Sequence, residues 1–126
     1  MQEYFTHPYL INKYKFDFRM YVVLLQVVPY PLMLFYEDGM ARFCTEPYQE
    51  PTTKNMKNTY MHLTNYALNK RNPNYHKNEG ADDDNCGSKW GMEAVFEQME
   101  KDGCNLKQFK QQLFDIFIKT IFAALP

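Results

Sequence analysis

The chain has 126 residues, enough for one core, and its ten Tyr, ten Phe and one Trp would make that core bulky. The net charge of −1 argues against a broad nucleic-acid interface, which needs a clear basic excess. There is no apolar run of membrane-spanning length, no signal peptide and no paired cysteine framework, so we expect a soluble intracellular protein whose partners are neither nucleic acid nor membrane.

Residues 15–19, Lys-Phe-Asp-Phe-Arg, are typical of a strand with one charged face. Successive side chains of a strand alternate between faces, so Lys15, Asp17 and Arg19 would share one face and the phenylalanines the other. Two cations and a carboxylate in one row suit an anionic ligand with a bound cation. The alternative, which stays open on these residues alone, is that Asp17 pairs with Arg19 or Arg42 to satisfy a core.

The next segment is predicted to form further strands. Residues 20–28 are almost continuously apolar, as in a strand covered on both faces. A second apolar run, residues 32–36, is followed by Asp38-Gly39 and then by a third run that contains Arg42. Asp-Gly between two apolar runs is a strong hairpin signal. We therefore expect a hairpin turn at this dipeptide that brings Arg42 beside the charged strand.

The middle of the chain is predicted to be irregular. Residues 45–58 are typical of a loop, with or without a short turn of helix, and residues 59–70 are ambiguous between a strand and an irregular segment that lines a ligand. Residues 71–88 are polar, which predicts a mobile surface loop. Within it, residues 82–85 resemble part of a calcium loop but lack its Gly and Glu, so we interpret them as a solvated acidic turn.

The last third is predicted to contain two helices. Helical spacing runs from residue 89 to residue 101, and Gly103 would stop that helix. Asn105 would cap a second helix, whose main apolar stripe is Leu106, Phe109, Leu113, Ile116, Phe117 and Ile121. Residues 118–125 are apolar on every side of that helix, which indicates a piece of a larger protein. The order of elements predicts an α+β fold, mainly an antiparallel sheet with C-terminal helices.

Other candidate sites carry weaker signals. The three histidines have no Cys or carboxylate at ligand spacing, so a zinc site is not predicted. Cys44 is interpreted as a small core residue. Residues 62–65, His-Leu-Thr-Asn, place an imidazole, a hydroxyl and an amide close together, although periodicity alone favours an ordinary strand end with a capping Asn.

Several of these segments together resemble the tubulin–tyrosine-ligase-like family of ATP-dependent amino-acid ligases. They occur in the family's order and approximate spacing over at least residues 1–70. The stretches that carry the resemblance are residues 2–5, 10–11, 15–22, 39–48 and 61–70, with residues 87–89 and the final helix adding weaker support. The resemblance implies an ATP-grasp fold, of which residues 1–126 would be a central part of the catalytic domain.

The resemblance also implies a role for particular residues. The positions that match the family's nucleotide-binding residues are Gln2, Glu3, Tyr4, Phe5, Lys15, Asp17, His62, Leu63, Thr64 and Asn65. The positions that match its arginines facing the terminal phosphate and the acceptor carboxylate are Arg19 and Arg42. The family's metal-binding carboxylates lie C-terminal to this region, so no metal ligands are expected here.

The implied activity is tubulin polyglutamylation, with ATP and Mg²⁺ as cofactors. A glutamate carboxylate of a tubulin C-terminal tail would be activated as an acyl phosphate and then joined to free glutamate. The implied location is the cytoplasmic microtubule cytoskeleton, including the axoneme of cilia or flagella. Residues 41–48 and 62–70 look most like glutamate-adding members. The alternatives are a glycine- or tyrosine-adding member, or a non-catalytic module that binds tubulin or microtubules.

Overall fold

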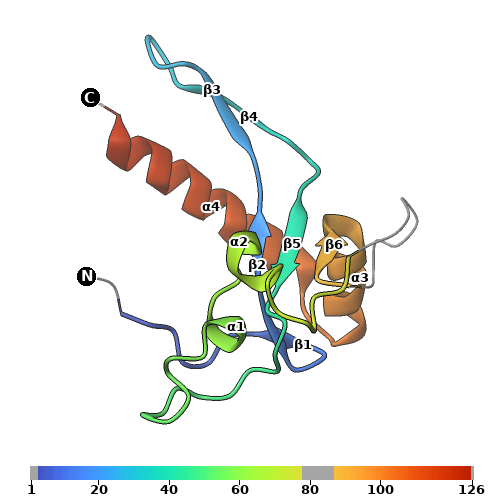
Figure 1. Cartoon of the computed structure of the whole chain (residues 1–126). Helices are drawn as coiled ribbons and strands as arrows, with labels where there is room; N and C mark the ends of the chain where they lie inside the picture. Colours follow the sequence, from blue (N-terminus) through green and yellow to red (C-terminus); the bar gives the residue numbers. More distant parts are fainter. Residues whose placement is uncertain (1–2, 78–86, 126) are drawn as a thin grey trace.

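The computed structural model describes residues 3–77 and 87–125, and all strand pairs in this part of the chain are antiparallel. A four-stranded sheet has the order β1 (Leu10–Ile11), β2 (Tyr14–Arg19), β5 (Met40–Phe43) and β6 (Lys89–Gly91). Strands β3 (Val22–Gln26) and β4 (Leu32–Phe35) pair separately as a hairpin that extends away from this sheet (Figure 1). The predicted α+β class with an antiparallel sheet and C-terminal helices is confirmed.

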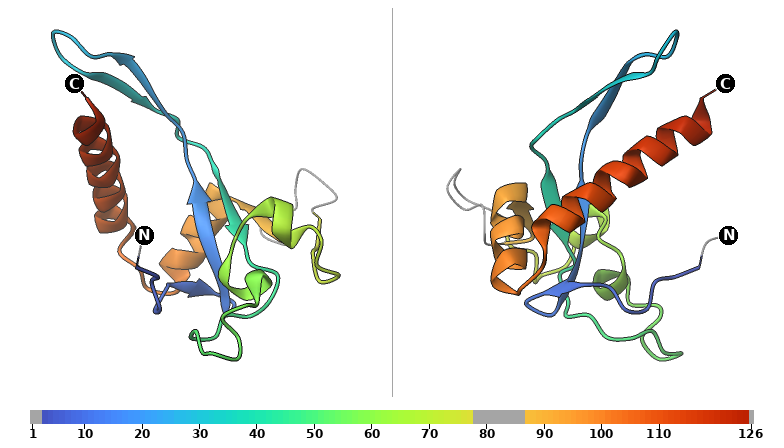
Figure 2. Two further views of the ribbon diagram at one scale, coloured as in Figure 1. Left: turned by 60° about the vertical axis from the view of Figure 1, so that its left-hand side comes forward. Right: turned by 180° about the vertical axis from the view of Figure 1, so that it is seen from behind.

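Two pairs of helices lie on opposite sides of the four-stranded sheet (Figures 1 and 2). The short helices α1 (Thr59–His62) and α2 (Tyr66–Asn69) lie on one side, and α3 (Met92–Lys101) and α4 (Leu106–Ala124) lie on the other. The core forms between the sheet and the second pair, where the buried residues are Ile11, Ala41, Phe43, Val95 and Met99. One sheet face is therefore sealed by apolar side chains, and the other is left for polar chemistry.

The predicted hairpin turn at Asp38-Gly39 is wrong. The chain turns at residues 27–31, between β3 and β4, and the hairpin is closed there by Gln26 Nε2 donating to Tyr30 O at 3.2 Å. Gly39 serves a different purpose, because a Cβ at this position would lie 2.6 Å from the carbonyl oxygen of Arg19. The glycine permits close backbone approach where β5 begins beside the end of β2.

The prediction that residues 20–28 are covered on both faces is also wrong. Val23 is 52% exposed and Leu25 is 57% exposed, because no second layer lies over the hairpin among the described residues. The hairpin contacts α4 at its base, where the ring of Phe35 lies 4.9 Å from that of Phe114 and 5.7 Å from that of Phe117. Apolar sequence here specified a strand and not its burial.

Residues 59–70 form neither of the two predicted structures. They fold into α1 and α2, joined by the extended residues 63–65. Asn58 caps α1 by accepting a hydrogen bond from Tyr60 N at 3.2 Å, which favours a helical turn over a strand. Residues 45–58 form no helix or strand, as predicted.

The C-terminal helices differ from their prediction in two details. Residues 89–91 form β6 instead of a first helical turn, because they pair with β5, so α3 begins at Met92. Gly103 has a φ of +85° and Asn105 caps α4 by accepting from Gln108 N, as predicted. Most of the predicted stripe of α4 is half-buried, but Ile116 is 58% exposed because it faces away from the hairpin base and core.

The predicted loop over residues 71–88 lies partly outside the described residues, and residues 82–85 lie wholly outside them. Its described parts, residues 71–77 and 87–88, contain no helix or strand. Within the described ranges, no helix is both long enough and apolar enough to cross a membrane.

Candidate functional site

The charged face predicted for β2 is present. Phe16 and Phe18 pack against the core cluster, which leaves Lys15, Asp17 and Arg19 on the opposite face of the strand. That face is turned toward α1 and α2, as Lys15 Nζ shows by donating to the carbonyl oxygen at the end of α1 at 2.9 Å. The alternation of the sequence therefore separates an apolar face from a charged face.

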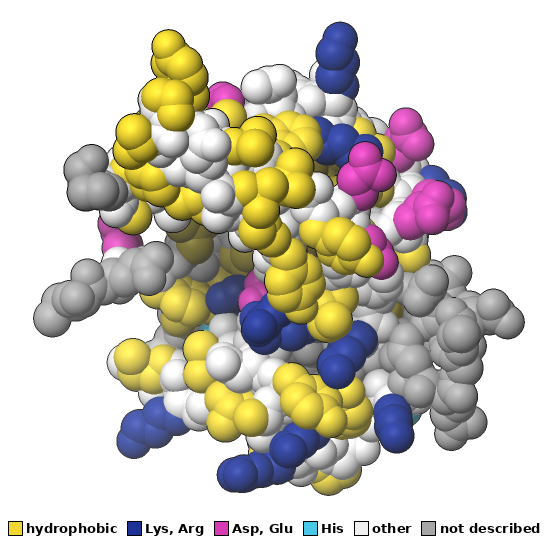
Figure 3. All heavy atoms as spheres, turned by 90° about the horizontal axis from the view of Figure 1, so that it is seen from above, with side chains coloured by type: hydrophobic (Ala, Val, Ile, Leu, Met, Phe, Trp, Pro, Cys, Tyr) yellow, Lys and Arg dark blue, Asp and Glu magenta, His cyan; other side chains and the backbone are white. Residues whose placement is uncertain are grey.

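The register of the sheet adds two more cations to the charged face. Asp17 lies directly opposite Arg42 of β5, and Arg42 lies opposite Lys89 of β6. Residues that oppose each other in neighbouring strands point to the same side of a sheet. This side, called the charged face below, therefore carries Lys15, Asp17, Arg19, Arg42 and Lys89. A view from the hairpin end shows Lys and Arg side chains gathered near the middle of the surface, among hydrophobic side chains (Figure 3).

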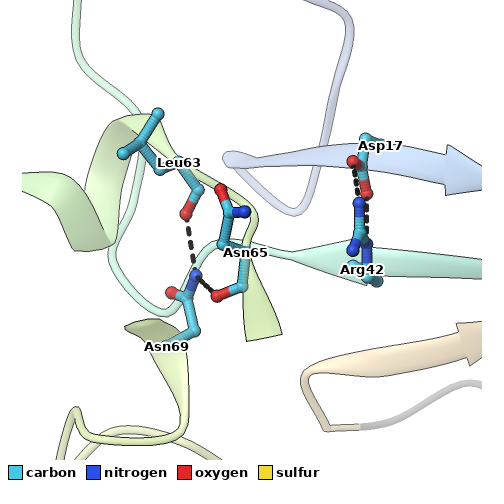
Figure 4. A network of polar contacts seen from close by, with 5 residues as sticks. All are labelled: Asp17, Arg42, Leu63, Asn65 and Asn69. Carbon is cyan, nitrogen blue, oxygen red and sulfur yellow. Dashed lines mark hydrogen bonds and ion pairs between the residues drawn. The ribbon is translucent and has the colours of Figure 1, made fainter. Parts of the chain in front are cut away.

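Asp17 and Arg42 form a two-pronged ion pair across the strands. Arg42 Nε donates to Asp17 Oδ1 at 2.9 Å, and a terminal guanidinium nitrogen donates to Oδ2 at 2.5 Å (Figure 4). The hydrogen bonds to the carboxylate raise the pKa of Arg42 above its ordinary value. The pairing of Asp17 considered in the sequence analysis is thus real, but the side chains are 38% and 22% exposed, so the pair lies at the surface of the sheet and not in a core.

Arg19 has a different environment from Arg42. Its side chain is exposed, and its guanidinium carbon lies 5.9 Å from the centre of the Tyr21 ring. With the residues that the structure describes, it makes no hydrogen bond or ion pair. Arg19 is therefore a cation at the edge of the charged face whose donors are available to an anion.

Three of the predicted nucleotide-binding residues lie in one cluster although they are far apart in the sequence. Lys15 Nζ donates to Tyr4 OH at 3.0 Å, and Tyr4 OH lies 3.1 Å from His62 Nδ1. Burial raises the pKa of Tyr4, so its phenol keeps its proton at neutral pH. The phenol oxygen accepts from Lys15, and which partner donates in its hydrogen bond with His62 Nδ1 depends on the tautomer of the histidine.

This arrangement leaves the second ring nitrogen of His62 without a partner among the described residues. In the tautomer in which Nδ1 accepts from Tyr4, Nε2 carries the ring proton and is a hydrogen-bond donor. His62 is only 6% exposed, and its Nε2 has no hydrogen-bond partner among the described residues. A buried donor without a partner costs about 1–3 kcal/mol. A ligand that brings an oxygen acceptor, as ribose and phosphate do, would remove that cost.

The rest of the predicted segment, residues 63–65, connects α1 to α2. Asn65 stands at the N-cap position of α2, as a capping Asn would, but its side chain makes no capping hydrogen bond, and the predicted strand end is wrong because the segment lies between two helices. Leu63 is 42% exposed. Thr64 and Arg42 line the same small cavity, of about 10 Å³, which places this segment beside the charged face.

The N-terminal residues are only partly brought to the site. Gln2 lies outside the described residues, and Glu3 and Phe5 are exposed, with Phe5 at 80%. Of the described residues in this stretch, only Tyr4 joins the cluster. Cavities of about 480, 510 and 570 Å³ occur elsewhere in the described chain, and no residue of the charged face lines them. The charged face is thus an open surface in this chain.

The described residues do not supply a metal site. No group of three or more His, Cys, Asp or Glu side chains is close enough there to hold an ion. Cys44 is buried beside the end of β5, and this burial raises the pKa of its thiol to about 12. The thiol is therefore protonated and unreactive, in agreement with its interpretation as a small core residue.

Comparison with known proteins identifies the family. The sequence profile of the tubulin-tyrosine ligase family matches residues 1–125. The chain belongs to the tubulin-tyrosine ligase family. This confirms the family resemblance found in the sequence.

Three relatives of the tubulin-tyrosine ligase family illustrate the similarity. The chain is 40% identical over 126 residues to Tubulin polyglutamylase TTLL11 of Homo sapiens, and 44% identical over 127 residues to Tubulin polyglutamylase ttll-11 of Caenorhabditis elegans. It is 38% identical over 127 residues to Tubulin monoglutamylase TTLL4 of Mus musculus. The matches include 100% of this chain but only 17%, 18% and 10% of those proteins, so the chain spans less than a fifth of their length.

The structure of this family member also reveals residues that the sequence analysis did not select. Asn69 and Asn72 are buried, and Asn58 holds α1, all in the part of the chain that carries residues 62–65. Glu46 accepts from Asn58 Nδ2 at 2.6 Å and from Asn72 Nδ2 at 3.1 Å. The signal that could have found them is the density of Asn between residues 55 and 74, which is unusual for a segment that is not a simple loop.

Proposed function

We propose that the full-length protein is an ATP-dependent carboxylate–amine ligase of the polyglutamylase type, which adds glutamate to glutamate side chains of tubulin tails. The observation that carries this proposal is the charged face, where Arg19 has no anionic partner among the described residues and lies in one row with Lys15. The names of the relatives, which are polyglutamylases and a monoglutamylase of tubulin, support the choice of glutamate and of tubulin.

The proposed nucleotide contacts follow from the polar atoms that the fold leaves free. His62 Nε2 would donate to a ribose or phosphate oxygen, and the side-chain amide of Asn65 is not used in capping. Thr64 lies beside the charged face and would contact the phosphates. Lys15 would place its positive charge near the nucleotide, since it already bridges Tyr4 and α1. The stretch of Gln2, Glu3 and Phe5 is proposed to pass the adenine, and Leu63 to contact the ribose.

The proposed reaction needs cations because both reactants are anions. An oxygen of the tail carboxylate attacks the γ-phosphorus of ATP, the bond to ADP breaks, and an acyl phosphate results. The amine of free glutamate then attacks the acyl carbon, phosphate leaves with the bonding electrons, and a proton is lost as the amide forms. Arg19 and Arg42 would stabilise the charge on the phosphoryl group during transfer. Arg42 shares its charge with Asp17, so Arg19 is the freer of the two.

Mg²⁺ belongs to the proposal only as the counter-ion of ATP. Since the described residues offer no group of ligands for it, its ligands are proposed to lie in another part of the protein. The proposed place of action is the microtubule cytoskeleton of the cytoplasm, which follows from tubulin as the acceptor.

The test compares Arg19→Ala with Lys107→Ala in the full-length protein, incubated with ATP, Mg²⁺, tubulin and labelled glutamate. Both variants lose one exposed positive charge, but Lys107 lies on α4, on the other side of the sheet. We expect Arg19→Ala to incorporate glutamate about 10²-fold more slowly, as for other preorganised donors. Lys107→Ala should keep the wild-type rate, and both should keep the wild-type melting temperature.

Three results would contradict parts of this proposal. An unchanged rate in Arg19→Ala removes the charged face from the reaction. Incorporation of only glycine or only tyrosine overturns the choice of glutamate and leaves the ligase class intact. No incorporation and no ATP turnover by the wild-type protein favours the non-catalytic module that binds tubulin.

A further inference from the structure

Asn69 is the polar side chain most completely enclosed beside the candidate site. It is 1% exposed and stands at the end of α2. Its Oδ1 accepts from Thr45 N at 3.0 Å and from Thr45 Oγ1 at 2.9 Å. Its Nδ2 donates to Leu63 O at 2.7 Å and to Asn65 O at 3.1 Å. All four hydrogen-bonding positions of the amide are therefore occupied.

These four bonds tie together segments that are distant in the sequence. Thr45 lies two residues after the end of β5, whereas Leu63 and Asn65 flank Thr64 in the connection between α1 and α2. In Figure 4 the amide of Asn69 points at the two carbonyl groups, while the side chain of Asn65 points away from it. The amide thus fixes the backbone on both sides of Thr64 against the strand that carries Arg42.

Only a side chain with two donors and two acceptors on one small planar group can make this set of bonds. An aspartate would keep the two bonds from Thr45 but would direct negative oxygens at two carbonyl oxygens. An alanine would leave Leu63 O and Thr45 Oγ1 without the Asn69 amide, which is costly for buried groups, whereas Thr45 N would keep its bond to Tyr60 O and Asn65 O its bonds from backbone N–H groups. Asn69 also lines the same small cavity as Thr64 and Arg42, so it lies directly behind the candidate site.

We infer that Asn69 is a positioning residue: it holds residues 63–65 in the conformation that binds the nucleotide, without touching the nucleotide itself. This inference rests on the proposed function, because residues 63–65 are nucleotide contacts only there. Glu46 reinforces the same geometry, because its carboxylate joins the cap of α1 to Asn72 beyond α2. The segment is therefore held beyond its two helices by Glu46 and on both sides of Thr64 by Asn69.

The experiment measures KM for ATP and kcat in the full-length protein for Asn69→Ala and Asn69→Asp, together with melting temperatures. We expect both variants to raise KM for ATP about tenfold or more, with a smaller change in kcat, since displacement of a binding segment by even 1 Å can cost up to 10²-fold. The Asp variant has a further signature. When its buried carboxyl is protonated it can donate one bond, so the KM ratio of variant to wild type should fall from about pH 8 to about pH 6.

Asn105→Ala is the matched structural control, because it removes a side-chain amide contact at the start of α4, on the opposite side of the sheet. It should lower the melting temperature and leave KM for ATP unchanged. Thr45→Val is a milder test, because it removes one bond to Asn69 Oδ1 and keeps the backbone bond. We expect a rise in KM of a few-fold for this variant.

The outcomes separate the inference from the proposed function. If the Asn69 variants melt at lower temperature but keep the wild-type KM for ATP, Asn69 is a structural residue only and the inference is overturned. If they do not fold, an unchanged KM in Thr45→Val overturns it equally. If the wild-type protein itself neither binds nor turns over ATP, the proposed function is contradicted, and the inference is contradicted with it because it assumes nucleotide binding by residues 63–65.

Discussion

The four-stranded sheet alternates charged and apolar residues and the β3–β4 hairpin is almost wholly apolar, yet the buried apolar side chains are those of the sheet. Ala41 and Phe43 of β5 are 0% and 6% exposed, whereas Leu25 of β3 and Leu34 of β4 are 57% and 53% exposed. The sheet is covered by α3, which contributes Val95 to the core, and the described hairpin has no such layer along its length (Figure 2). The difference shows that apolar patterning specifies a strand, whereas burial depends on a second element that packs on it.

The same comparison explains where polar chemistry can occur. In the four-stranded sheet, one face is sealed by helices, so the alternation of β2 leaves a clean row of charges on the other face. In the hairpin, both faces carry large apolar side chains such as Val23 and Leu24, and neither face has a row of charges. A large exposed apolar surface of this kind is typical of a contact surface. The charged face and the exposed hairpin thus have the same cause: helices α3 and α4 cover one face of the four-stranded sheet but do not cover the hairpin along its length.

The largest effect is expected from Phe43→Ala, which removes a ring from the covered sheet. The Phe43 ring lies 5.1 Å from that of Phe16 and 5.0 Å from that of Trp90, so its loss would leave a cavity. We expect a loss of about 3–5 kcal/mol in the free energy of unfolding, measured by guanidinium denaturation of the full-length protein. A loss below about 1 kcal/mol would mean that this sheet is no better covered than the hairpin.

An intermediate effect is expected from the pH dependence of Cys44, at the end of the covered sheet. Its pKa is raised by burial from an ordinary value of 9.0 to about 12 in the folded protein. A raised pKa stabilises the fold fully below the unfolded value, and this stability is lost as pH rises from there toward the folded value. The wild-type protein should therefore lose roughly 1 kcal/mol more per pH unit above about pH 9 than Cys44→Ala does.

Denaturation curves of the two proteins between neutral and alkaline pH provide the measurement. The subtraction removes the titration of tyrosines, which both proteins share. Parallel pH profiles would show that the thiol ionises as easily in the folded chain as in the unfolded one, in contradiction to its burial.

The smallest effect is expected from Leu25→Ala in the hairpin. Because this side chain is 57% exposed, its truncation should change the free energy of unfolding by less than about 0.5 kcal/mol. The measurement is the same denaturation experiment in the full-length protein. A loss above about 2 kcal/mol would show that another layer covers the hairpin in the full-length protein. The difference in burial between the two sheets would then hold only for residues 1–126.

Local patterns in the sequence predicted much of the fold but not the partners of each element. The alternation of residues 15–19 correctly predicted the charged face, and Asn105 correctly marked the start of a helix. The Asp38-Gly39 signal failed because the glycine is needed for close approach to the carbonyl oxygen of Arg19 on the neighbouring strand. No local sequence pattern contains that contact. Placing Arg42 beside β2 was nevertheless correct, since a turn at residues 27–31 brings the same strands together.

In the candidate site, too, the sequence identified individual residues but not the long-range contacts between them. The sequence selected Tyr4 and His62 by resemblance, but only the fold shows that their hydrogen bond joins positions 58 residues apart. Asn69 was not selected as a site residue because its four hydrogen bonds reach residues 45, 63 and 65, and no local pattern shows them.

By itself, the sequence determined which residues form the β2 strand, which face of that strand is charged, and where α4 begins. These features depend on the period of side-chain direction and on capping, both of which act within a few residues. Only the tertiary structure decided that Asp17 pairs with Arg42, that His62 keeps a buried ring nitrogen without a partner among the described residues, and that the hairpin stays exposed. These features depend on which distant elements meet, and that is set by packing of the whole chain.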